Sequence, residues 1–178
     1  KLRGGTENVP AIAGAYASLK HNFADRSVKN EKMLILKTYL VDSLKKHLPQ
    51  GTYRKYFTRE TKLPYEFIVL GPLDFRTCKT LHYTIPKVLP NTLLLSFVKN
   101  KGDPFCNVKL KKYLDKNNII VSIGSACSTS SKKASHVLYA IKAPDKVKRG
   151  VMRVSLCDNT TKADIDKFIK VLIMGLKK

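Results

Sequence analysis

The sequence predicts an α/β fold in which a small mixed sheet of about four strands carries helices packed on one face. Apolar residues recur at helical spacing in some segments, whereas other segments are short and continuously apolar, as strands are. These segments mix without a strict βαβ repeat, which favours a small sheet over a long parallel one. The chain has 178 residues, 43% of them hydrophobic, which is enough for the core of one domain.

Two helices are expected at the start of the chain. The first begins near Pro10, a residue favoured in the first turn, and its apolar face consists of Ile12, Tyr16, Leu19 and Phe23. Asp25-Arg26-Ser27 interrupts this pattern. A longer helix follows over residues 28–47, and Pro49-Gln50-Gly51 ends it. Its apolar side consists of Met33, Leu36, Leu40 and Leu44.

The middle of the chain supplies strands. Residues 66–70 and 92–98 are apolar runs bounded by turn residues, the pattern of buried strands. A short helix is expected over 107–116, and the apolar run that follows it predicts a strand over 119–123.

The last third of the chain continues this alternation. We expect a helix over 134–141, a turn at residues 143–145 and a strand over 151–156. The final helix begins at Thr161-Lys162-Ala163-Asp164, which resembles a capping box. Its apolar face consists of Ile165, Phe168, Ile169, Leu172 and Leu176.

Cys127 lies in a run of small and hydroxylated residues, 123–131, between a predicted strand and a predicted helix. Few bulky side chains are present there to bury the thiol, and a reacting thiolate needs solvent access. The alternative is that Cys127 is a small buried hydrophobe, as most free cysteines are. The four cysteines include no Cys-x-x-Cys pair, so no structural zinc site or other metal site is expected.

The net charge of +21 is large and would attract polyanions. The basic residues are scattered in ones and twos, without a stripe that interleaves aromatic side chains, so any binding of nucleic acid is expected to be non-specific. No apolar run approaches membrane-spanning length, and no signal peptide is recognisable. We therefore expect no membrane association and an intracellular, cytoplasmic location. The chain starts at Lys1 in what reads as a loop, so we expect it to be the C-terminal part of a longer protein.

Three segments, in this order, resemble the cysteine desulfurases, which are pyridoxal-phosphate (PLP) enzymes related to class V aminotransferases. The first is Arg3-Gly4-Gly5-Thr6-Glu7-Asn8-Val9-Pro10. The second is Gly124-Ser125-Ala126-Cys127, with His136-Val137-Leu138 nine residues after the cysteine. The third is Arg153-Val154-Ser155-Leu156, followed by Thr160-Thr161 and a final helix. The resemblance implies fold type I of the PLP-dependent transferases, of which this chain would be mainly the C-terminal small domain.

The resemblance also implies roles for three residues. Cys127 would be the nucleophile that takes sulfur from substrate cysteine as a persulfide. Arg153 would bind the α-carboxylate of the substrate, because its planar guanidinium pairs with a carboxylate through two hydrogen bonds. Thr6 would contact the PLP phosphate. A homodimer and a sulfur-acceptor protein are the partners that the resemblance implies for the full-length protein.

The PLP lysine of the family's large domain is missing from this chain. The family's PLP lysine usually follows a histidine, and no His-Lys pair occurs in this chain. We therefore expect residues 1–25 to be the end of the large PLP domain and the connecting helix, and residues 26–178 to be the small domain. Residues 52–88 match the family poorly, and Cys157 stands where the family usually has glycine.

The sequence favours part of a desulfurase-like enzyme that is inactive as this chain alone. The main alternative is a catalytically degenerate relative that acts as a binding or regulatory module, with affinity for polyanions. A selenocysteine lyase is a third hypothesis. Taken without the resemblance, Arg153 would be a structural ion-pair partner and Thr6 an ordinary helix-start residue.

Overall fold

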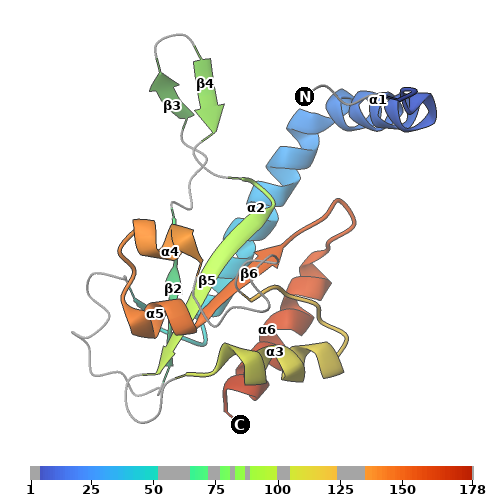
Figure 1. The fold of residues 1–178 in the computed structure, drawn as a ribbon. Coiled ribbons are helices and arrows are strands. Elements are labelled where there is room, and N and C mark those ends of the chain that lie inside the picture. Colours follow the sequence, from blue (N-terminus) through green and yellow to red (C-terminus); the bar gives the residue numbers. More distant parts are fainter. Residues whose placement is uncertain are drawn as a thin grey trace.

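The computed structural model describes residues 5–51, 65–71, 77–80, 83–86, 89–99, 105–123 and 135–177, with backbone only for 77–80 and 83–86. Its centre is a four-stranded sheet in the order β1-β2-β5-β6 (Figure 1). The strands are β1 (Gln50–Gly51), β2 (Tyr65–Val69), β5 (Thr92–Lys99) and β6 (Val151–Ser155). β1 pairs with β2 in parallel, and the other pairs are antiparallel. The predicted small mixed sheet is confirmed.

A second, two-stranded sheet lies apart from the first. It is an antiparallel hairpin of β3 (Thr77–Thr80) and β4 (Tyr83–Pro86) (Figure 1). It falls within residues 52–88, which match the family poorly, and it was not predicted from the sequence.

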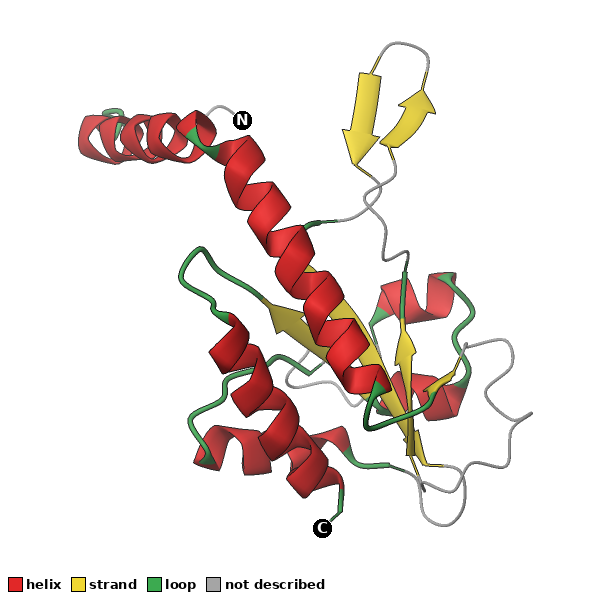
Figure 2. Ribbon diagram, turned by 180° about the vertical axis from the view of Figure 1, so that it is seen from behind, coloured by secondary structure: helices red, strands yellow, loops and turns green. Residues whose placement is uncertain are grey.

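Three helices form the main layer on one face of the large sheet. They are α2 (Arg26–Lys45), α3 (Asn107–Lys116) and α6 (Lys162–Leu176) (Figure 2). Alternate strand residues face this layer, because successive side chains of a strand point to opposite faces of the sheet. The fully buried centre of this core contains Leu44, Phe67, Phe97, Met152 and Leu172.

The opposite face of the sheet carries two short helices, α4 (His136–Ala140) and α5 (Asp145–Arg149). Leu138 of α4 and Val147 of α5 join a separate buried cluster with Val98 of β5. The prediction of helices on one face therefore describes the main layer and omits this smaller one. α5 is only five residues long, too short to show a helical period in the sequence.

The predicted strand over 119–123 is wrong. Ser122 alone pairs with β6, as an isolated bridge to Arg153. The Ile119 amide instead donates to the Leu114 carbonyl at the end of α3, and the Ile120 side chain is 91% exposed. The run has a high intrinsic preference for strand, but it meets a partner strand at one residue only.

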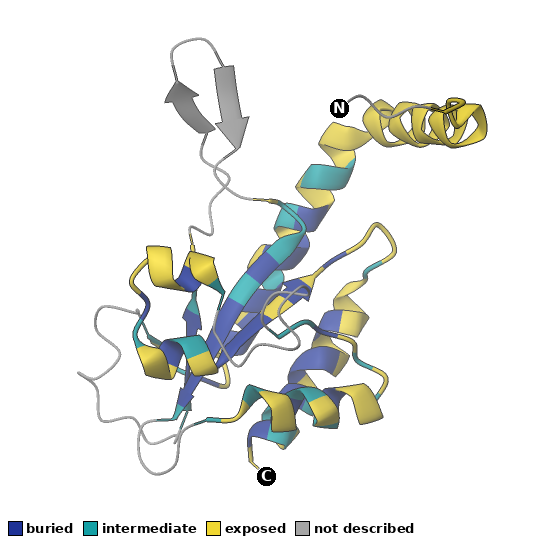
Figure 3. Cartoon of the chain, in the orientation of Figure 1, coloured by how far each residue is buried: buried dark blue, intermediate teal, exposed yellow. Residues whose placement is uncertain are grey.

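The first helix, α1 (Val9–Ala24), contributes no residue to the buried clusters, although the Arg26 guanidinium of α2 lies 5.0 Å from the centroid of its Phe23 ring. None of its residues is buried (Figure 3), and exposure of its predicted apolar face runs from 57% at Leu19 to 66% at Tyr16. Asp25 separates α1 from α2. No helix in the described part of the chain is both long enough and apolar enough to cross a membrane.

Candidate functional site around Arg153

Arg153 lies in the middle of β6, opposite Leu94 of β5. Met152 and Val154, its neighbours in the strand, point into the main core, so Arg153 points to the other face of the sheet and is exposed. The strand thus fixes the backbone of Arg153 and leaves its side chain accessible to solvent.

Ser122, in the segment that precedes Cys127, is hydrogen-bonded to Arg153 through its backbone and its side chain. The Arg153 amide donates to the Ser122 carbonyl at 2.7 Å, and the Ser122 amide donates to the Arg153 carbonyl at 3.2 Å. The Arg153 Nη2 also donates to the Ser122 Oγ at 3.3 Å. The contact of Ser122 with Arg153 could not be predicted from the sequence, because a single bridge leaves no periodic pattern.

The Arg153 guanidinium makes no ion pair with any residue that the structure describes. The interpretation of Arg153 as a structural ion-pair partner thus finds no support in the described part of the chain. An exposed guanidinium with one hydroxyl contact still has donors for a planar carboxylate, which it can bind through two hydrogen bonds.

Cys127 lies outside the described residues, in the segment 124–134. The described chain stops at Ile123, directly after the bridge to Arg153, and resumes at Ser135. Ser135 caps α4, where its hydroxyl accepts from the Val137 amide at 3.3 Å. His136 is exposed at the first position of this helix.

Thr6 lies in the segment that leads into α1 and is exposed. Asn8, not Thr6, caps the helix, because the Asn8 Oδ1 accepts from the Ala11 amide at 3.2 Å. The reading of Thr6 as the residue that starts the helix is therefore wrong, and its hydroxyl has no hydrogen-bond partner among the described residues. α1 lies beyond the first turn of α2 and away from β6, so the structure does not bring Thr6 and Arg153 together (Figure 1).

These residues do not make a complete PLP site. Thr6 offers one hydroxyl for a phosphate and Arg153 one guanidinium for a carboxylate, on elements that lie apart. The sequence contains no His-Lys pair to supply the lysine that would hold the PLP aldehyde. In the described ranges, no three His, Cys, Asp or Glu side chains gather to hold a metal ion.

Cys157 follows β6 and is exposed. The Thr160 hydroxyl accepts from the Cys157 amide at 2.9 Å and lies 3.4 Å from the Cys157 Sγ. Hydrogen bonds from the Thr160 side chain, and then from the Asn159 backbone, lower the pKa of the Cys157 thiol. The φ angle of Cys157 is not positive, so the side chain fits without left-handed strain where the family has glycine.

The loop after Cys157 is tied to α2. Lys29 Nζ lies 3.4 Å from the Asp158 Oδ2, and Lys32 donates to the Asp158 carbonyl. No pattern in the sequence predicted the contact between Cys157 and Thr160, which is three residues further along the chain.

Residues 78–168 match the family model described as Aminotransferase class-V. A cysteine desulfurase, IscS, from Clostridium botulinum (strain Hall) is 30% identical over 176 residues, covering 99% of this chain and 36% of the relative. A cysteine desulfurase from Nostoc sp. is 33% identical over 172 residues, covering 96% of this chain and 34% of the relative. The chain therefore spans about a third of the length of the curated relatives that it matches.

A solved structure of a NifS-like protein shows the same fold. It superposes with a TM-score of 0.66 at 25% sequence identity, covering 99% of this chain and 36% of that one. A NifS-like protein from Rickettsia africae gives a TM-score of 0.65 at 23% identity, covering 99% of this chain and 37% of that one, a likeness of fold alone.

Proposed function

Because the chain belongs to the aminotransferase class-V family, we propose that it is part of a cysteine desulfurase-like PLP enzyme. This enzyme moves sulfur from L-cysteine to Cys127 as a persulfide and releases alanine. One observation carries the proposal: the exposed guanidinium of Arg153 has no carboxylate partner among the described residues and is hydrogen-bonded to Ser122. Ser122 lies five residues before Cys127, and five residues of chain reach about 18 Å at most.

The roles of the two residues follow from their chemistry. PLP, when bound, supplies an electron sink on the substrate amine. Arg153 holds the α-carboxylate in its planar fork and so fixes the direction in which the substrate sulfur points. The Cys127 thiolate forms an S–S bond with that sulfur as the C–S bond of the substrate breaks. The carbon skeleton takes a proton and leaves as alanine.

Most of the PLP site is assigned to parts of a longer parent protein. In this proposal Thr6 contributes a hydroxyl to the PLP phosphate, and the lysine for the aldehyde comes from the large domain. Residues 1–25 then belong to the end of that large domain and the connecting helix. The end of α1 at Ala24 and its lack of buried residues support a boundary at this point. The 178-residue chain alone is expected to release no alanine.

The same proposal includes partners and a location. A homodimer brings Thr6 to a PLP site that its own chain does not complete. An acceptor protein receives the sulfur, since a persulfide that stays on the enzyme ends the cycle after one turnover. An intracellular, cytoplasmic location suits this chemistry, because free thiols persist in reducing compartments.

Cys127→Ala in the longer parent tests the function. We expect alanine production from L-cysteine and the persulfide on this residue both to be lost, while the absorbance of bound PLP is unchanged. Cys106→Ala is the matched control, because Cys106 is an exposed free cysteine that the proposal leaves without a role. Normal sulfide release by Cys127→Ala would contradict the proposal.

Arg153→Lys separates carboxylate binding from sulfur transfer. Lysine keeps the charge but loses the second hydrogen bond, so the KM for cysteine should rise by about tenfold, corresponding to about 1.4 kcal/mol of binding. An unchanged KM would remove Arg153 from the substrate site.

The alternative, a catalytically degenerate binding or regulatory module, is favoured by three features: the net charge of +21, the poor match of residues 52–88 to the family and the cysteine at position 157. It predicts a parent that forms no alanine from cysteine at all. It also predicts polyanion binding that weakens steeply as salt is added.

A further inference from the structure

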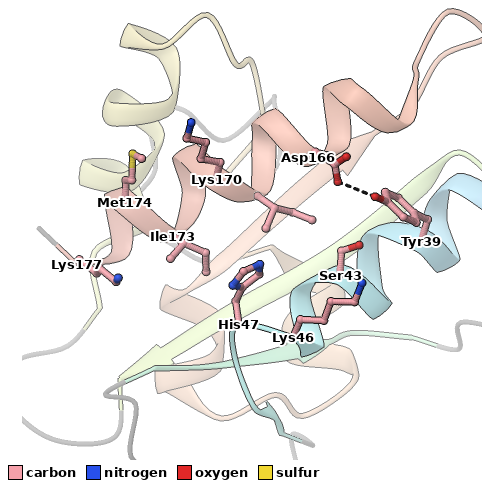
Figure 4. A pocket seen from close by; sticks show the side chains of 10 residues that line it. Tyr39, Ser43, Lys46, His47, Asp166, Lys170, Ile173, Met174 and Lys177 are labelled. Atoms are coloured by element: carbon pink, nitrogen blue, oxygen red, sulfur yellow. Dashed lines mark hydrogen bonds between the residues drawn. The ribbon is translucent and has the colours of Figure 1, made fainter.

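The surface between α2 and α6 is hollowed, away from Arg153 and Ser122. The hollow, here called the α2–α6 groove, has a volume of about 480 Å³ (Figure 4). Three side chains of α6 make its apolar part: Ile169 is buried, Ile173 is half-buried and Met174 is 46% exposed. Ile173 and Met174 are therefore the apolar side chains of the hollow that remain accessible to a partner.

Lysines surround this apolar part. Lys46 lies directly after α2, Lys170 lies on α6 and Lys177 caps the end of α6 (Figure 4). All three are exposed, and none forms an ion pair with a residue that the structure describes.

The one carboxylate in the groove is already engaged. The Tyr39 hydroxyl donates to the Asp166 Oδ1 at 2.8 Å. This hydrogen bond raises the pKa of Tyr39, so the phenol stays protonated and the pair stays intact near neutral pH. Three lysines against one aspartate leave the groove with an excess of positive charge.

We propose that the α2–α6 groove docks an acidic amphipathic helix of a partner protein. A groove between two helices is the shape into which a third helix can lay an apolar face, with anchors at positions i, i+3, i+4 and i+7. Acidic residues beside these anchors would meet the lysines. Met174 suits such a surface, because its unbranched side chain adapts to different partners.

A nucleic acid fits the groove less well. Phosphates would satisfy the lysines but would leave Ile173 and Met174 uncovered, so the apolar part would contribute nothing. The proposal concerns a face of the domain other than the one that carries Arg153, and it holds whether or not the parent is a desulfurase.

The test uses the full 178-residue chain and a fluorescein-labelled 18-residue peptide with leucines at i, i+3, i+4 and i+7 and glutamates elsewhere. A scrambled peptide of the same composition keeps the charge but has no apolar face. We expect the patterned peptide to bind at least about tenfold more tightly than the scrambled one, a difference of about 1.4 kcal/mol. Equal binding of the two peptides, or none, would overturn the proposal.

Charge reversal locates the site. Lys170→Glu should weaken binding of the patterned peptide by about tenfold or more. Lys112→Glu on α3, also exposed, changes the net charge equally and should have much less effect. If the two variants weaken binding equally, only the diffuse charge of the chain is at work. Urea unfolding of each variant checks that the fold is kept.

Methyl NMR gives a readout that does not depend on charge. The chain has three methionines, of which Met33 and Met152 are buried. With labelled methionine methyl groups, the patterned peptide should shift the Met174 signal and leave the other two in place. A duplex DNA that produces the same shift would assign the groove to polyanions instead.

Discussion

Gly150 shows how closely two backbones approach in this domain. A Cβ atom at this position would lie 2.0 Å from the Phe97 carbonyl oxygen. The two residues are already joined by a hydrogen bond from the Phe97 amide to the Gly150 carbonyl at 3.1 Å. To relieve this contact, the Phe97 carbonyl and residue 150 would have to move apart, which would disturb the adjacent end of the β5–β6 pairing.

We therefore predict that Gly150→Ala destabilises the domain by about 2 kcal/mol or more, at the upper end of overpacking effects. The free energy of unfolding in urea measures this. Gly14→Ala is the control, since nothing lies within 4 Å of a Cβ there; it should not destabilise the domain, and it should stabilise the exposed helix α1 by up to about 1 kcal/mol. Equal effects of the two substitutions would show that the close contact is absent in solution.

The lowered pKa of Cys157 predicts its reactivity. The Thr160 side chain, the largest cause, stabilises the thiolate, so alkylation should reach its half-maximal rate at a lower pH than for an ordinary cysteine. Thr160→Val removes this donor and should move the pH profile of Cys157 alkylation upward. Mass spectrometry of peptides after brief treatment with iodoacetamide follows each cysteine separately.

The hydroxyl should be sufficient for this effect. Thr160→Ser keeps it and should restore the profile, whereas Cys106, remote in sequence, should react alike in all three proteins. If Thr160→Val leaves the Cys157 profile where it was, the hydrogen bond has no influence on the thiol.

At the scale of elements, the N-terminus of α6 is a cap that could be identified from the sequence. The Thr161 hydroxyl accepts from the Asp164 amide at 3.2 Å, and the Thr161 amide donates to the Asp164 carboxylate at 2.9 Å. Thr161→Ala should therefore lower the free energy of unfolding by about 1 kcal/mol at pH 7. Thr161→Ser, which keeps the oxygen, should lose much less. Equal losses would mean that the threonine methyl, and not the cap, stabilises the helix.

The cap should also depend on pH. Hydrogen bonds from the Thr161 side chain and backbone lower the pKa of Asp164. A carboxyl whose pKa is lowered by folding stabilises the fold above its unfolded pKa, about 3.9 for aspartate, and loses this contribution as the pH falls through the folded pKa. The stability difference between wild type and Asp164→Asn should thus be present at pH 7 and shrink in strong acid.

The elements that were predicted correctly are those whose sequence signal is local. α6 has a cap and a buried face at helical spacing, and β5 is a run of apolar residues bounded by turns. The segment 119–123 has the composition of a strand but lacks a partner beyond Ser122, and pairing is a property of the whole fold. α5 is too short for a period, and β1 has only two residues.

The residues of the candidate site were predicted from the family resemblance, and their contacts were not predicted. Arg153 was predicted from the resemblance of its segment to a family. The structure adds the contact of Arg153 with Ser122, which no pattern in the sequence indicates. Thr6 and Cys127 remain predictions, the latter outside the described residues. The lowered pKa of Cys157 could not be predicted from the sequence, because only the fold of the loop brings the Thr160 hydroxyl to the sulfur.

At the scale of the whole molecule, α1 is a helix in which every residue is exposed among the residues that the structure describes. One face of the helix carries an apolar stripe of Ile12, Tyr16, Leu19 and Phe23. Each of these side chains is nevertheless more than half exposed. Burying one such side chain stabilises a protein by about 1.5–3 kcal/mol. The curated relatives are about three times as long as this chain, and we infer that the proposed large domain of the parent covers the stripe.

Leu19→Lys tests this organisation in two proteins at once. In the 178-residue chain Leu19 is already exposed, so the substitution should change the free energy of unfolding by less than about 0.5 kcal/mol. In the longer parent it would place a charge in an apolar contact and should cost about 2 kcal/mol or more. His21→Lys, on the opposite face of α1, should be mild in both proteins. A mild effect of Leu19→Lys in the parent would mean that the large domain does not cover this stripe, and residues 1–25 would then have to be assigned to another contact.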